Sequence, residues 1–240
     1  MGYGATAGVT GGVTTRLPQS ALSSGAIFHL VGLAADAAGS GDPLEWQVLR
    51  YRRIQGVEYT RPSWTWPLQP AAAQLDHLAH TFTEEFFSTC PPAARTLWSR
   101  AAGTRTVPEF MNDLATLLRM ACREPEATYE EIPLASWELA VRFPQLLGLE
   151  TWLDPAFPDE EDPIRAAAES EHPYCAELLP ELIAQVTQAL ALCRDSEAFA
   201  AQLRAHCGSA APEVLAEVAD LAFAHMAREH RNGTLVTPPA

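Results

Sequence analysis

The sequence predicts an all-α protein: an irregular multi-helix bundle of roughly nine or ten helices, with a small acidic C-terminal subdomain of three helices. Three observations lead to this fold class. Apolar residues recur at steps of three and four along most of the chain. Pro, Asp-Pro, Thr or Asp precede these runs and Gly follows them, as helix ends require. Alanine, which has the highest helix propensity, is abundant.

In the first half of the chain, these signals predict five helices. They span about residues 43–56, 75–86, 92–103, 106–124 and 133–148. Thr106 and Glu109 have the spacing of a capping box, in which each side chain bonds the backbone N–H of the other residue. Alternation with period two is confined to residues 9–14, which fit a small hairpin or a mobile tail; we favour the tail.

Further helices are predicted to begin at Pro163, Pro173, Asp195 and Pro212. The predicted organisation has five parts: a flexible Gly/Thr-rich segment over 1–18, a main bundle over 19–153 that includes an aromatic loop at 57–70, an acidic Pro-rich linker over 154–162, a helical subdomain over 163–231 and a tail over 232–240. The linker marks the boundary because it is rich in proline and acidic residues.

Composition excludes several enzyme classes. The chain has no lysine, so it cannot form a Schiff base, use a Walker A or kinase lysine, or use a Ser–Lys dyad. It also has no Gly-x-Ser-x-Gly elbow and no Gly-x-Gly-x-x-Gly fingerprint after a strand. Use of Arg and Ala in place of Lys and Ile is typical of GC-rich bacterial genomes. No cofactor is indicated by a motif.

The formal net charge of −14 argues against nucleic-acid binding, which needs a surplus of cations. The charge is uneven: residues 1–123 hold 10 Arg and 9 acidic residues, whereas residues 124–240 hold 6 Arg and 21 acidic residues. Such an acidic half serves solubility, or it steers a partner protein with a basic surface. Both interpretations stay open.

Cysteine usage and hydropathy predict a cytoplasmic protein. Five cysteines without a Cys-x-x-Cys pair are expected to be reduced thiols, three of them within apolar helical runs. We expect no apolar run to reach the ~18 residues that a membrane span requires, and no secretory signal is recognised. We therefore expect no membrane association.

The aromatic loop is the clearest candidate for binding. Trp64 and Trp66 stand between two prolines, which stiffen an extended segment, and Arg50, Arg53 and Arg61 are close by in the sequence. Exposed Trp beside Arg is the composition of binding hot spots, and paired indoles also stack planar ligands. The alternative is that the loop folds back and both indoles fill the core.

The best metal candidates are His77, His80 and Glu84, whose spacing would place them on one face of one helix. A helical wheel puts that face opposite the apolar stripe, so a solvated polar face is the competing interpretation. His225 continues an apolar stripe, and Glu229 follows one turn later; they make a second candidate ligand pair.

Two functions remain open. One is a non-catalytic acidic helical protein that binds a basic protein partner, of the adaptor, accessory chaperone or neutralising type. The other is a helical-bundle enzyme or cofactor binder that acts on a small apolar or aromatic molecule, with or without a metal held by His and Glu. Glu169 and His172 have the spacing used in di-iron bundles, but Pro173 favours a helix cap for His172.

Overall fold

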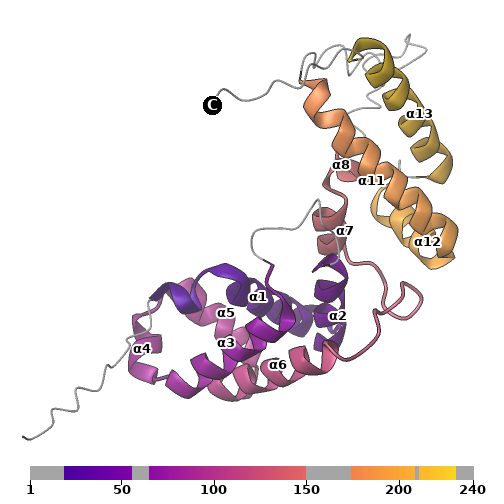
Figure 1. The fold of residues 1–240 in the computed structure, drawn as a ribbon. Helices are drawn as coiled ribbons and strands as arrows, with labels where there is room; N and C mark the ends of the chain where they lie inside the picture. Colours follow the sequence, from indigo (N-terminus) through magenta and orange to yellow (C-terminus); the bar gives the residue numbers. More distant parts are fainter. Residues whose placement is uncertain (1–18, 56–64, 150–173, 209–210, 231–240) are drawn as a thin grey trace, which may run out of the picture.

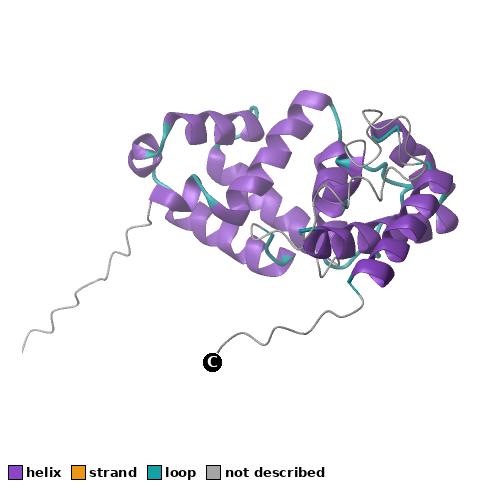
Figure 2. Ribbon diagram, turned by 90° about the horizontal axis from the view of Figure 1, so that it is seen from above, coloured by secondary structure: helices purple, strands orange, loops and turns teal. Residues whose placement is uncertain are grey.

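The computed structural model describes residues 19–55, 65–149, 174–208 and 211–230 of the chain (Figure 1). These residues form eleven α-helices and one 3-10 helix, and they contain no strand (Figure 2), which confirms the all-α prediction. The elements in order are η1 (Gln19–Leu22), α1 (Gly25–Ser40), α2 (Leu44–Gln55), α3 (Leu68–Thr81), α4 (Glu84–Thr89), α5 (Pro92–Ala102), α6 (Val107–Ala121), α7 (Ser136–Arg142), α8 (Pro144–Leu147), α11 (Cys175–Asp195), α12 (Glu197–His206) and α13 (Pro212–Glu229).

The helices gather around two hydrophobic cores. Helices α1 to α6 enclose the first core and form what we call the N-terminal lobe, in which α3 lies along α6 and α1 lies against α5 (Figure 1). The largest side chains buried there include Trp98 and Phe110, whose rings meet edge to face at 6.2 Å. Burial of these apolar faces is what makes the short helices stable, since isolated helices of this length are marginal.

The second core belongs to what we call the C-terminal lobe. Helices α11, α12 and α13 supply most of it, and residues between 129 and 149, α7 and α8 included, pack into it as well. Phe199 lies at its centre, with ring centroids 4.7 Å from Tyr129 and 6.0 Å from Phe143. The break between the two cores therefore falls between residues 121 and 129. The linker predicted over 154–162 lies outside the described residues and stays a prediction.

Local signals set several helix ends as predicted. The capping box of Thr106 and Glu109 is present at the start of α6. Helix α5 begins at Pro92 and ends before Gly103, whose φ of +62° is one that glycine adopts without penalty. Ser196, and not Asp195, caps α12 by accepting a hydrogen bond from the Phe199 N–H.

Two predicted helices are wrong in their extent. The run over 75–86 is broken because Phe82 has extended backbone dihedrals and the Thr83 side chain caps a new helix, α4. The run over 133–148 divides into α7 and α8 at Phe143, which precedes a proline and leaves the helical region. Helix α1 was not predicted, although Gly41, whose φ is +80°, ends it.

Helix α1 also corrects the expectation about hydropathy. Counting only length and composition, residues 20–40 would be sufficient to cross a membrane, and this is the single stretch of that kind within the described part of the chain. In the folded chain, α1 buries one face that includes Ile27, Leu30 and Val31. A core helix passes the same test of length and composition, so the finding is weak evidence for a membrane span.

A polar junction joins α2 to the segment that leads into the C-terminal lobe. Arg50 donates to the Pro133 carbonyl at 2.9 Å and to Asp42 at 2.9 Å. Arg53 donates to the Ile132 carbonyl at 2.9 Å. Its other terminal nitrogen pairs with Glu138 of α7, also at 2.9 Å. Both arginine side chains are buried, so their charges serve contacts within the chain.

Aromatic and charged groups are stacked at this junction. The guanidinium of Arg53 lies over the Tyr129 ring at 4.3 Å, and Arg142 donates to the Tyr129 hydroxyl at 2.6 Å. Burial raises the pKa of Tyr129 to about 12, because the phenolate would lose its hydration. Burial also raises the pKa of Glu138, although the Arg53 charge acts in the opposite direction.

Candidate functional site

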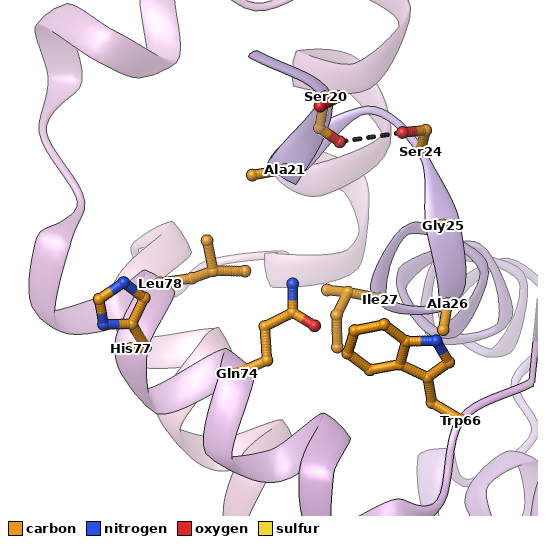
Figure 3. Close-up of a pocket in the computed structure, with 10 residues that line it drawn as sticks. All are labelled: Ser20, Ala21, Ser24, Gly25, Ala26, Ile27, Trp66, Gln74, His77 and Leu78. Atoms are coloured by element: carbon orange, nitrogen blue, oxygen red, sulfur yellow. Dashed lines mark hydrogen bonds between the residues drawn. The ribbon is translucent and has the colours of Figure 1, made fainter. Parts of the chain in front are cut away.

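A cavity of about 330 Å³ in the N-terminal lobe is the candidate site. Its wall consists of the turn between η1 and α1, Ile27 of α1, the indole of Trp66 and one face of α3 (Figure 3). The lining residues are Ser20, Ala21, Ser24, Gly25, Ala26, Ile27, Trp66, Gln74, His77 and Leu78. This volume lies at the lower end of the range for small-molecule sites.

The turn that forms the rim is fixed by backbone geometry. The φ of +78° at Gly25 is in the left-handed region, which glycine adopts without the penalty of a Cβ. The Ser24 hydroxyl donates to the Ser20 carbonyl at 3.1 Å and closes the turn (Figure 3). From the other side, the Trp98 indole N–H donates to the Leu22 carbonyl at 2.8 Å, which attaches the turn to α5.

Trp66 is held by its backbone while its indole lies against the cavity. The Trp66 N–H donates to the Tyr51 hydroxyl at 2.7 Å, and that hydroxyl donates to the Trp66 carbonyl at 3.1 Å. Gln55 also donates to this carbonyl. The residue is nevertheless 42% exposed, so apolar surface of the indole faces the cavity and solvent. Of the predicted loop residues, Trp64 and Arg61 lie outside the described residues.

Gln74 is the main polar group of the cavity. It comes from α3 and projects its carboxamide toward Ile27 and the Trp66 indole (Figure 3). Its Oε1 is buried and has no hydrogen-bond partner among the described residues. A buried acceptor without a partner costs about 1–3 kcal/mol, so a ligand that supplies a donor would recover that cost. His77 is the only titratable side chain among the lining residues, so the cavity offers no acid–base pair.

The predicted metal residues of the N-terminal lobe are not brought together. His77 and His80 are exposed on α3, and Glu84 is exposed as the first residue of α4. The helix break at Phe82 separates Glu84 from the two imidazoles, so the expected common helix face does not form. No group of three potential ligands that includes them is found in the part of the chain that the structure describes.

His225 is buried, as its place in an apolar stripe predicts, but its neighbours differ from the expected one. Glu229 is exposed as the last residue of α13. Instead, His225 lies beside Cys175 and His230. The sequence analysis missed both Cys175 and His230 as neighbours of His225. Cys175 was interpreted as an ordinary core thiol, and His230 was not considered. The spacing His225-x4-His230, within the range of paired zinc ligands, was the signal that could have found the second.

Comparisons with protein-family models, with characterised proteins and with solved structures find no match to this chain. The cavity and the side chains around it therefore carry the functional argument.

Proposed function

We propose that this chain binds a small aromatic molecule that carries one hydrogen-bond donor, and that it binds without catalysing a reaction. The cavity beside Trp66 carries this proposal. Its apolar floor and exposed indole suit a flat apolar ring. Gln74 would accept the ligand's donor, which gives the site orientation and selectivity. The lack of an acid–base pair among the lining residues supports binding rather than turnover.

We also propose that the chain is cytoplasmic. Its five cysteines, all within the described residues, form no disulfide with one another. Reduced thiols persist in that compartment.

Phenol and toluene test the proposal, because both have a benzene ring but only phenol carries a hydroxyl that can donate a hydrogen bond. We expect ligand-observed NMR to show phenol binding about 2–10-fold more tightly than toluene, the value of one net hydrogen bond. Gln74→Leu should abolish that preference, and Trp66→Ala should weaken the binding of both molecules. Gln69→Leu, an exposed position on the same helix, is the matched control and should change neither affinity. Equal phenol preference in Q74L and in the wild type would contradict the proposal.

The surface of α13 favours a second candidate function, binding of a basic protein partner. Glu213, Glu217 and Asp220 are exposed at positions that share one helix face. Phe223, which is 55% exposed, lies beside this stripe. An acidic stripe with an exposed aromatic residue would attract a basic partner and then provide an apolar contact.

Salt-dependent capture tests this second candidate. We expect the wild-type chain to retain a basic protein from source-cell extract at about 50 mM NaCl and to release it at about 500 mM, since salt screens exposed charges. The variant E213Q/E217Q/D220N should lose the capture. A matched variant that neutralises three exposed acids elsewhere, E84Q/E85Q/E124Q, should keep it. Capture that is equal in both variants would exclude the α13 stripe as the contact.

A further inference from the structure

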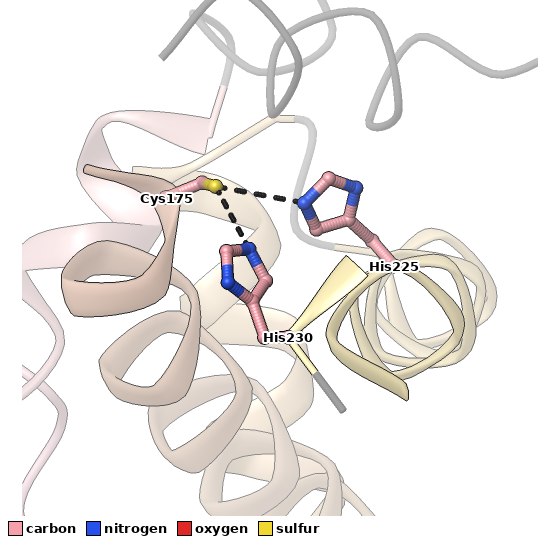
Figure 4. Close-up of side chains that lie close together, drawn as sticks. All are labelled: Cys175, His225 and His230. Atoms are coloured by element: carbon pink, nitrogen blue, oxygen red, sulfur yellow. Dashed lines mark hydrogen bonds between the residues drawn. The ribbon is translucent and has the colours of Figure 1, made fainter. Parts of the chain in front are cut away.

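Three potential metal ligands meet where the first turn of α11 approaches the end of α13. Cys175 is the first residue of α11, His225 is near the end of α13, and His230 follows directly after that helix (Figure 4). The Cys175 Sγ lies 3.5 Å from Nε2 of His225 and 3.2 Å from Nε2 of His230. The three candidate ligand atoms all lie within 4.8 Å of one another.

We propose that these three side chains bind one Zn²⁺ ion. A tetrahedral zinc ion, with bonds of about 2.3 Å to sulfur and about 2.1 Å to nitrogen, holds its sulfur and nitrogen ligands about 3.6 Å apart. The two Sγ–Nε2 distances are already close to that value, so the sulfur needs little movement relative to either imidazole. Three protein ligands leave one position of the ion for water or a further ligand.

Hydrogen bonding of a neutral thiol accounts for both contacts only if the two imidazoles hold different tautomers. The single S–H then donates to one Nε2, and the sulfur accepts from the Nε2–H of the other ring. A single cation accepts electron pairs from the sulfur and from both imidazoles at once. Both imidazoles turn Nε2 toward the sulfur, so each ring offers one nitrogen to a common ion (Figure 4).

Helix ends supply a suitable electrostatic environment. The thiolate of Cys175 would lie at the N-terminal end of α11, where the helix dipole favours negative charge. The imidazoles lie at the C-terminal end of α13, where the last carbonyls favour a cation. The two helices are antiparallel neighbours, so both effects act at the same place.

The ligand set selects the metal. One thiolate with two imidazoles suits zinc and related transition-metal ions, whereas Mg²⁺ and Ca²⁺ prefer oxygen ligands. Cys175 and His225 are 0% and 1% exposed, and His230 is half-buried. Such burial is typical of a metal ligand more than of a nucleophilic cysteine that must reach a substrate. The ion would link the start of α11 to the end of α13.

Metal analysis of the full chain, expressed without a histidine tag, tests the site. We expect about one zinc per chain in the wild type and less than about 0.1 in Cys175→Ser or His225→Asn, because each ligand contributes strongly to affinity. Cys193→Ser, a half-buried thiol on the same helix, and His80→Asn, an exposed imidazole, are matched controls and should keep the zinc. Equal zinc content in the wild type and C175S would overturn the proposal.

Cobalt titration keeps the test decisive if the variants fail to fold. Wild-type chain stripped with a chelator and then titrated with Co²⁺ should show the visible bands of a tetrahedral ion together with a thiolate-to-cobalt charge-transfer band. Zinc should displace the cobalt, and the melting temperature should rise when either ion binds. Absence of the charge-transfer band at stoichiometric cobalt would overturn the proposal, since it would show that no thiolate is a ligand.

Discussion

The variant Glu138→Leu is expected to lose about 3–5 kcal/mol of unfolding free energy, the cost of removing one partner from a buried ion pair. The side chains of Arg53 and Glu138 are 1% and 0% exposed, and their nearest atoms are 2.9 Å apart. Without the carboxylate, the Arg53 guanidinium stays buried with only backbone carbonyls as acceptors. Urea denaturation followed by far-UV circular dichroism measures the loss.

The double variant R53M/E138L separates the charge effect from lost packing. Removing both charges should recover at least about 1 kcal/mol of the loss, because no uncompensated charge then remains in the core. Asp113→Asn, which breaks an exposed ion pair with Arg105, is the control and should change stability little. A double variant no more stable than E138L would show that the carboxylate does not act by compensating the Arg53 charge.

The buried Glu138 carboxyl also predicts a pH dependence, whose sign is opposite to that of an ion pair alone because the cost of desolvating the carboxylate outweighs its attraction to Arg53. Since the folded pKa of Glu138 is raised above the ordinary value of 4.5, the folded state binds more protons than the unfolded state just above that pH. The contribution of Glu138 to stability is therefore complete below about pH 4.5 and is lost as pH rises through the folded pKa. The stability of the wild type relative to E138Q should decline over this window. A difference that grows with pH would contradict the expected direction.

Trp98→Ala is the second variant with a large expected effect, a loss of about 3–5 kcal/mol, because it removes the largest fully buried side chain of the N-terminal lobe. It also removes the hydrogen bond that Trp98 donates to the Leu22 carbonyl. Since Leu22 belongs to the turn at the cavity rim, phenol binding should weaken as well. Thermal or urea denaturation gives the first effect, and NMR titration gives the second.

Two further variants separate stability from binding at this place. Trp98→Phe keeps most of the ring and leaves the Leu22 carbonyl without its donor, so a smaller loss of about 1–3 kcal/mol is expected. Trp66→Ala should lower phenol affinity with little change in stability, because the residue is 42% exposed. If Trp66→Ala destabilised the chain as much as Trp98→Ala, the indole would be a core residue and the cavity argument would fail.

Short-range signals predicted those helix ends that are set by a capping residue or a glycine. Thr106 and Glu109 form their capping box and Gly103 ends α5, because a cap or a left-handed turn involves residues at most a few positions apart. The break at Phe82 was missed although it is also local. The apolar spacing continued through it, and only the Thr83 cap, with its bond to the Phe86 N–H, shows that a new helix begins.

The candidate sites needed the tertiary structure. Trp66 was predicted to be a binding residue from its sequence context, and it lines the cavity, but Gln74, which lines the same cavity, had no signal in the sequence. Arg50 and Arg53 were predicted at a binding surface; both are buried in the junction between the lobes. Hydropathy does not predict that burial, because a guanidinium is buried only when acceptors from elsewhere in the sequence, here backbone carbonyls and a carboxylate, bind it.

The amino-acid sequence alone determined that this chain is helical, where several helices begin and end, and that its second half is acidic. Helical periodicity and capping are interactions between near neighbours, so they can be recognised without the fold. Only the tertiary structure decided which polar groups are brought together. Cys175 and His225 are 50 positions apart, and the antiparallel packing of α11 against α13 places their side chains 3.5 Å from one another.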